Sequence, residues 1–188
     1  ANAYPHIYAT VGSHPDSADE VNDAVLEEYR MLCKQNPKIR AIGEIGLDFA
    51  CDIGCETQIS IFRAQLAIAE RLHKPVVLHC VRAFEYIMRV LENYCLKAVI
   101  FHGFIGSKEQ AQRAVAQGFY LSFGERTFRS PKTIEALRST PLSQLFVETD
   151  ESTTPIEEIY AKIAELRGIP TTELITAAEE NYNRIFKG

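Results

Sequence analysis

Four side chains able to bind a metal ion stand at the ends of four apolar stretches of the sequence. They are Glu44, His79, His102 and Asp150, and each ends a run rich in Val, Ile, Leu or Phe. Two imidazoles and two carboxylates form a ligand set that suits a zinc or manganese ion in a hydrolytic centre. One such residue would carry little information, but four in equivalent places predict a single metal site assembled from distant parts of the chain.

The chemistry of the four groups supports this prediction. Two carboxylates about 4 Å apart repel each other by about 4 kcal/mol at an effective dielectric constant of ~20, and a divalent cation removes that cost. Next to water activated by such an ion, Asp150 is an adequate base, so it is the candidate proton acceptor of the reaction. Other interpretations stay open: a strand histidine is often a hydrogen-bonded core residue, and an aspartate often caps a loop.

The elements that would position these residues alternate along the chain. Apolar residues three and four positions apart predict a helix after nearly every strand-like stretch. The strand-like stretches are residues 7–12, 41–44, 75–79, 98–102, 119–122 and 145–150. They show little alternation of apolar and polar residues, which is typical of parallel strands covered by helices on both faces. The sequence therefore predicts the α/β fold class with a parallel sheet.

A closed barrel explains the four polar residues more economically than an open sheet does. In a TIM-type (β/α) barrel, the carboxyl ends of all strands open on one shared face, where residues distant in sequence converge. An open sheet would spread the four ends over several strand spacings of about 4.8 Å each. We therefore expect a single barrel domain over residues 1–188.

Composition and charge limit the class of protein. The net charge of −5 comes without a basic stripe, so we expect no extended surface for binding nucleic acid, although cleavage of DNA at a metal is compatible with it. No run of residues approaches the ~18 apolar positions of a membrane span. Five scattered cysteines are expected to be reduced thiols, and we expect a cytoplasmic protein.

Several motifs, in order, resemble those of one enzyme family. The stretch 43–48, Gly-Glu-Ile-Gly-Leu-Asp, is similar to the signature of the TatD-related metal-dependent hydrolases, which are barrel enzymes of the amidohydrolase superfamily. Further similarities are Gly-Ser-His-Pro at 12–15, His-Gly-Phe-Ile-Gly-Ser at 102–107, Glu-Thr-Asp at 148–150 and the terminal stretch 181–186. The resemblance covers the whole chain, and linked motifs are more specific than any single one.

The resemblance implies roles for particular residues. Glu44 would be the metal-binding carboxylate of the catalytic centre, and His79, His102 and Asp150 would complete the ligands of one or two divalent ions, with Zn, Mg and Mn all open. The family's H-x-H pair on its first strand is not found in this chain. We therefore expect a barrel that lacks its first one or two strands.

Two further residues are candidates to bind substrate. Arg82 follows the His79 strand and His14 lies in the Gly-Ser-His-Pro stretch, and either could hold a phosphate group. Arg82 could equally pair with Glu85. Arg126 and Arg129 follow another strand and could meet an anion, although a surface salt bridge is the expected role of each.

Three hypotheses follow from these observations. The first is a TatD-type deoxyribonuclease that uses metal-activated water on a phosphodiester, most simply at a DNA end. The second is a metal-dependent hydrolase of a small ester, lactone or amide, favoured by the net negative charge and by Glu-Ser-Thr-Thr at 151–154, where the family often has a proline and an aromatic residue. The third is a non-catalytic relative that has lost its metals. The metal's identity and the oligomeric state stay open.

Overall fold

The computed structural model describes residues 1–187, and the chain divides into two compact units. The first unit is Ala1–Val99, and the second begins at Ile100. Both contain parallel strands joined by helices, which confirms the predicted α/β class. The prediction of a single domain over residues 1–188 is not tested and stays a prediction. Among the described residues, no helix has the length and apolar character needed to cross a membrane.

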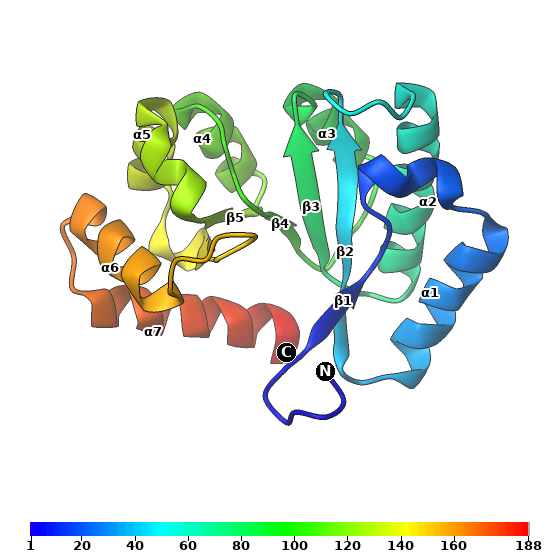
Figure 1. Cartoon of the computed structure of the whole chain (residues 1–188), viewed down its shortest axis with the longest axis horizontal. Coiled ribbons are helices and arrows are strands. Elements are labelled where there is room, and N and C mark those ends of the chain that lie inside the picture. The colour runs from blue at the N-terminus through cyan, green and yellow to red at the C-terminus, as the bar shows by residue number, and fades with distance from the viewer. Residues whose placement is uncertain (188) are drawn as a thin grey trace. The chain divides into compact units, whose positions relative to one another are not determined.

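The first unit is a three-stranded parallel sheet with its connecting helices (Figure 1). In chain order its elements are β1 (Ala9–Val11), the 3-10 helix Pro15–Glu20, α1 (Asp23–Gln35), β2 (Ile39–Asp48), α2 (Cys55–Arg71), β3 (Val76–Val81) and α3 (Phe84–Leu91). Strand β2 pairs with both β1 and β3, so that Thr10 lies beside Ala41 and Gly46 lies beside His79. The carboxyl ends of the three strands therefore lie at one edge of this sheet.

Burial explains why β2 lacks an alternating pattern. Ile42, Ile45 and Leu47 are at most 1% exposed, so both faces of the strand are covered. One face of α2 places Phe62 and Leu66 in the core, as the spacing of three and four predicted.

Two of the predicted strand ends are wrong by a few residues. Strand β2 continues past Glu44 to Asp48, and β3 continues past His79 to Val81. The cause is the register, because the pairing of β2 with β3 runs on from Ile45 beside Leu78 to Asp48 beside Val81. Glu44 thus projects from within β2, in a stretch where the register is irregular, and not from its last residue.

The second unit is also a three-stranded parallel sheet with helices. Its elements are β4 (Val99–Phe101), α4 (Lys108–Ala116), β5 (Tyr120–Phe123), the 3-10 helix Glu125–Arg129, α5 (Pro131–Ser139), the 3-10 turn Leu142–Gln144, β6 (Leu145–Val147), α6 (Ile156–Arg167), α7 (Thr171–Tyr182) and the π-helical turn Asn183–Lys187. Strand β5 pairs with β4 and with β6. Strand β6 ends at Val147, three residues before the predicted end at Asp150.

Polar side chains fix the ends of these elements. Ser107 and Gln110 form a capping box at the start of α4, and Gly118 adopts a positive φ of 79° just after that helix. The buried amide of Asn181 donates hydrogen bonds to the carbonyls of Leu142 and Leu145, at 2.8 and 2.9 Å. The terminal Asn motif therefore holds α7 against β6.

All five cysteines are free thiols, as expected.

Candidate metal centre

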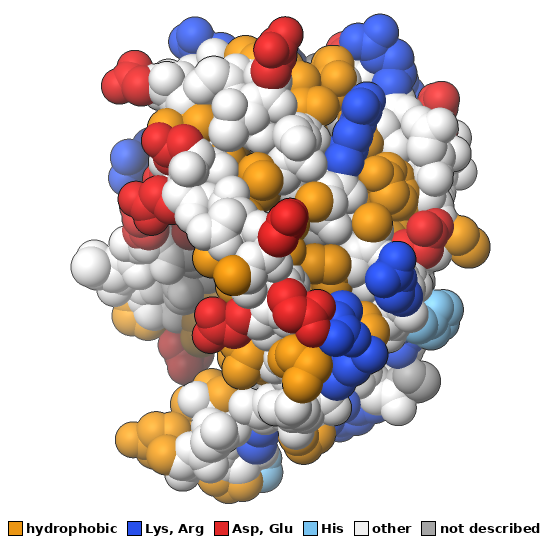
Figure 2. Space-filling view, turned by 90° about the vertical axis from the view of Figure 1, so that its right-hand side faces the viewer, with side chains coloured by type: hydrophobic (Ala, Val, Ile, Leu, Met, Phe, Trp, Pro, Cys, Tyr) orange, Lys and Arg blue, Asp and Glu red, His pale blue; other side chains and the backbone are white. Residues whose placement is uncertain are grey.

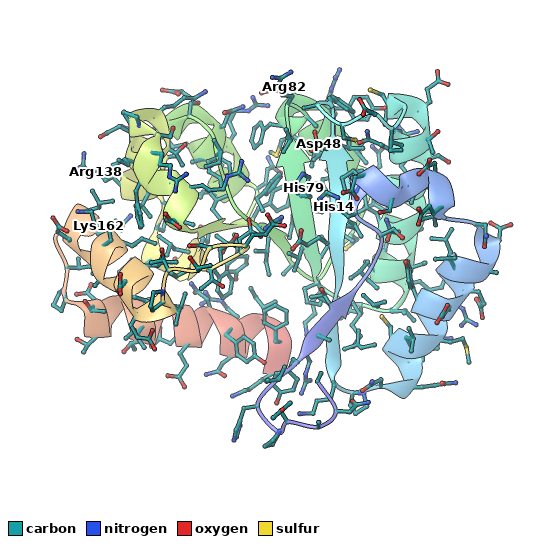
Figure 3. All side chains as sticks on the ribbon, viewed as in Figure 1. His14, Asp48, His79, Arg82, Arg138 and Lys162 are labelled. Atoms are coloured by element: carbon teal, nitrogen blue, oxygen red, sulfur yellow. The ribbon has the colours of Figure 1, made fainter. Side chains whose placement is uncertain are left out.

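Three side chains of the first unit that could hold a metal ion gather at the carboxyl edge of its sheet. His14 follows β1, Glu44 lies in β2 and His79 lies in β3, and one ligand atom from each lies within 4.8 Å of the others. The rings of His14 and His79 meet edge to face, with 4.2 Å between their centroids (Figure 3). All three residues are half-buried. The structure thus brings together two of the four predicted ligands, Glu44 and His79, and adds His14.

A carboxylate supports each of these histidines. Asp48 Oδ2 lies 3.3 Å from His79 Nε2, and both side chains are less than one-fifth exposed. When Nε2 carries the proton and donates it to Asp48, the lone pair of the ring is on Nδ1, which can then coordinate a cation. His14 Nδ1 lies 2.7 Å from Asp16 Oδ1, and the hydrogen bond to His14 lowers the pKa of the Asp16 carboxyl.

Two buried glutamines of α2 hold the backbone around this cluster. The side chain of Gln58 accepts a hydrogen bond from the Asp48 amide and donates one to the Asp48 carbonyl, both at 2.9 Å. Gln65, two helical turns further on, does the same for Ser13, the residue before His14. Each glutamine is only 1% exposed. Sequence reasoning had assigned neither a role, although amides seven residues apart on the apolar face of a helix are the signal that could have indicated one.

The Asp48→Ala variant is expected to bind metal about 10- to 100-fold more weakly, because the orientation of the His79 ring depends on the carboxylate behind it. Titration of the metal-free protein with zinc, followed by calorimetry, measures this affinity. Asp52→Ala is the matched control, because Asp52 is an exposed carboxylate of the loop that follows Asp48. Equal zinc affinity in the two variants would show that Asp48 does not orient His79 for metal binding.

The second unit carries the other two predicted ligands. His102 directly follows β4, and its Nδ1 lies 3.3 Å from Glu148 Oε1. Asp150 lies three residues past β6, with a left-handed φ of 51°. A Cβ atom added at Gly103 would lie 3.4 Å from the Glu148 carboxylate and 3.9 Å from Asp150 Oδ2. His102, Glu148 and Asp150 therefore lie around the same glycine. That they serve the same ion as Glu44 and His79 stays a prediction.

Cys80 is not among the donors that lie together in this cluster. Burial raises the pKa of its thiol to about 12, so the group stays protonated near neutral pH. Metal binding by cysteine requires the thiolate. The imidazoles and carboxylates are therefore the chemically suitable donors in the first unit.

The two predicted substrate-binding residues lie in different places. Arg82 is exposed, has a left-handed φ of 52° and extends beyond the end of β3, away from His14 and His79 (Figure 3). An extended chain advances about 3.3 Å per residue, which separates Arg82 from His79 by roughly 10 Å. His14, in contrast, lies at the ligand cluster itself. A role of either residue in binding substrate is untested.

The arrangement defines a class of protein. The His14, Glu44 and His79 donors lie within reach of a single ion and combine nitrogen with carboxylate oxygen, which fits a divalent metal such as zinc or manganese. Such a cluster at the carboxyl ends of parallel strands is the construction of a metal-dependent hydrolase.

Comparison with known proteins gives the family. Residues 1–187 match the model of the TatD related DNase family, and the chain belongs to this family. It is 32% identical to the uncharacterized metal-dependent hydrolase YjjV of Escherichia coli, over 99% of this chain and 79% of that protein. It is also 32% identical to the 3′-5′ ssDNA/RNA exonuclease TatD of Escherichia fergusonii, over 99% of this chain and 80% of that one.

Solved structures agree with this assignment. The crystal structure of Escherichia coli YjjV, a TatD homologue, matches the whole chain with a TM-score of 0.90 at 30% identity, and the match covers 79% of that structure. An amidohydrolase from Saccharomyces cerevisiae shares the fold, with a TM-score of 0.83 at 18% identity over 95% of this chain and 80% of the other. The predicted fold class, an α/β fold of the TIM type, and the predicted enzyme class, a hydrolase that depends on a divalent metal, are thus confirmed.

Proposed function

We propose that this chain is a deoxyribonuclease that hydrolyses a phosphodiester bond at the end of a DNA strand. The observation that carries the proposal is the cluster of His14, Glu44 and His79 in a chain of the TatD related DNase family. Glu44, His79, His102 and Asp150 would hold one or two ions of Zn, Mg or Mn, and His14 is a further candidate ligand. When bound, a divalent ion acts as a Lewis acid toward a phosphoryl oxygen and makes a hydroxide nucleophile available near neutral pH.

Side chains of this protein would accept the proton and orient the histidine ligands. The Asp150 carboxylate would accept the proton that the attacking water loses, which is general-base catalysis. Asp48 and Glu148 would hold the rings of His79 and His102, each at 3.3 Å. The half-buried position of these groups limits the number of competing water molecules and strengthens their electrostatic interactions.

Action at a strand end agrees with the surface of the protein. Figure 2 shows the face over α1 and α2, where acidic and basic side chains are interspersed and no basic stripe is visible. A net charge of −5 likewise gives little non-specific attraction for a long polyanion. These observations favour a substrate that enters a site over one that lies along a surface. A cytoplasmic location stays a prediction.

Cleavage of single-stranded DNA by the purified protein tests the proposal. We expect shortening of a labelled oligonucleotide with Mg²⁺, Mn²⁺ or Zn²⁺, no cleavage after chelation, and recovery when metal is restored. Intact DNA with every metal, under conditions where the protein is folded, would overturn the proposal.

Hydrolysis of a small ester, lactone or amide is the second candidate. The observation that favours it is the lining of a cavity in the second unit, where four carboxylates, those of Glu125, Glu148, Asp150 and Glu151, outnumber the two arginines. Such a cavity disfavours a substrate with several phosphates. Rates on p-nitrophenyl phosphodiesters and on p-nitrophenyl carboxylic esters, measured with the same metal, distinguish the two candidates.

A further inference from the structure

A cavity of about 410 Å³ opens at the carboxyl ends of the strands of the second unit. It is lined by residues that follow β4, β5 and β6, among them Gly103, Arg126 and Asp150. Cavities of a few hundred Å³ are the usual size of small-molecule sites. Because Asp150 is the proposed base, a molecule in this cavity lies next to the proposed chemistry.

Two of the six charged side chains that line this cavity, Glu125 and Arg129, neutralise each other. Glu125 accepts hydrogen bonds from Ser152 and Thr154 and forms a salt bridge with Arg129 at 2.9 Å. These bonds lower the pKa of the Glu125 carboxyl, so it stays ionised and fastens the segment after Asp150 to the 3-10 helix Glu125–Arg129. Glu148 likewise has His102 as a partner, at 3.3 Å.

Arg126 is the exception among the basic residues of the lining. Within residues 1–187 its side chain forms no salt bridge and no hydrogen bond, whereas Arg129, on the same 3-10 helix, pairs with Glu125. The expectation of a surface salt bridge is therefore met by Arg129 and not by Arg126. A guanidinium without a carboxylate partner at the wall of a cavity is suited to bind an anion, and its planar fork matches two phosphate oxygens.

Glycines bring the backbone close to the same space. A Cβ atom at Gly124 would lie 3.0 Å from the Glu148 carbonyl oxygen, a tight contact, so glycine there lets the backbone just after β5 and just after β6 approach closely. Thr149 and Thr153 also line the cavity and add hydroxyl groups. Beside the Asp150 and Glu151 carboxylates, the lining thus offers the Arg126 cation and hydroxyl groups, which are suitable partners for a phosphate and a sugar.

We propose that this cavity binds the phosphate group of a nucleotide, and that Arg126 is the residue that holds it. The inference rests on the proposed function for the identity of the anion, because a phosphodiesterase must hold a nucleotide beside its base. Arg126 would then bind substrate close to Asp150, which is the role that the sequence analysis predicted for Arg82.

Binding of thymidine 5′-monophosphate to the purified protein tests this assignment by calorimetry, without any need for turnover. Arg126→Gln is expected to raise the Kd about 10- to 100-fold, because two charge-assisted hydrogen bonds are lost. Arg126→Lys keeps the charge without the fork and is expected to fall in between. The matched control is Lys132→Gln, which removes a charge from an exposed position of α5 outside the cavity and should change the Kd less than twofold.

The outcomes separate this proposal from the proposed function. A wild-type protein that does not bind the nucleotide, or an Arg126→Gln variant that binds it as the wild type does, would overturn the assignment. If the protein binds the nucleotide through Arg126 but cleaves no DNA, the proposal of nucleotide binding in the cavity holds and the proposed deoxyribonuclease activity is wrong. Where DNA is cleaved, we expect Arg126→Gln to raise KM for DNA, whereas Lys132→Gln leaves it unchanged. Equal KM values would count against the assignment and leave the proposed function intact.

Discussion

Glu44→Gln is expected to lower kcat/KM for DNA about a thousandfold, which corresponds to about 4 kcal/mol of lost transition-state stabilisation. The amide keeps the shape of the side chain but removes its negative charge and makes it a weak metal ligand. His14 and His79 would then face the cation without the carboxylate that lies within 4.8 Å of them. Rates with saturating Mn²⁺, together with the metal content of the purified variant, measure both consequences.

Glu92→Gln is the matched control for this substitution. Glu92 is an exposed glutamate at the end of α3, in the same unit, so it reports the effect of removing one carboxylate without touching the cluster. We expect its rate and metal content to equal those of the wild type. A Glu44→Gln variant that retains full activity and metal would show that Glu44 is not a ligand.

Gly46→Ala is expected to destabilise the fold by at least about 3 kcal/mol and to lower Tm by roughly 6–12 °C. Gly46 has a φ of 145°, which L side chains rarely adopt. A Cβ atom there would overlap the carbonyl oxygen of His79 and lie 2.9 Å from its carbonyl carbon. Strands β2 and β3 would have to separate where Gly46 lies beside His79, which also displaces a proposed ligand.

Thermal unfolding followed by circular dichroism measures this loss, with Gly54→Ala as the control. A Cβ atom at Gly54 has no heavy atom within 4 Å, so that variant should lose less than about 1 kcal/mol. Equal melting temperatures for the two variants would show that the β2–β3 pair tolerates a side chain at position 46. The close approach of Gly46 to His79 would then not be needed for the stability of the fold.

The fold could be predicted because each strand and helix carries its own local pattern. Buried strands such as β2 lack alternation, and helices such as α2 repeat apolar residues at three and four. The ends of strands were less predictable, since they depend on pairing across the sheet. Nothing near Glu44 in the sequence shows that β2 stays paired with β3 as far as Asp48.

The grouping of Glu44 with His79 in the candidate site could also be predicted, but the surroundings of these residues could not. Glu44 and His79 were found from their place after apolar runs. His14 was predicted to bind substrate and not metal. Its closeness to His79 could not be predicted, because it is set by the turn after β1 and by the Gln65 amide that holds Ser13. Similarly, Arg82 and Arg126 are both arginines after a strand, and only the structure shows that Arg126 lines the cavity that contains Asp150.

Anomalous diffraction at the zinc absorption edge, from crystals grown with Zn²⁺, tests most directly whether Glu44 and His79 hold the metal. We expect a peak about 2.0–2.2 Å from a carboxylate oxygen of Glu44 and about 2.0–2.1 Å from a ring nitrogen of His79. An ion bound elsewhere on the molecule, with Glu44 and His79 contacting only protein groups, would contradict the metal centre on which the proposed hydrolysis depends.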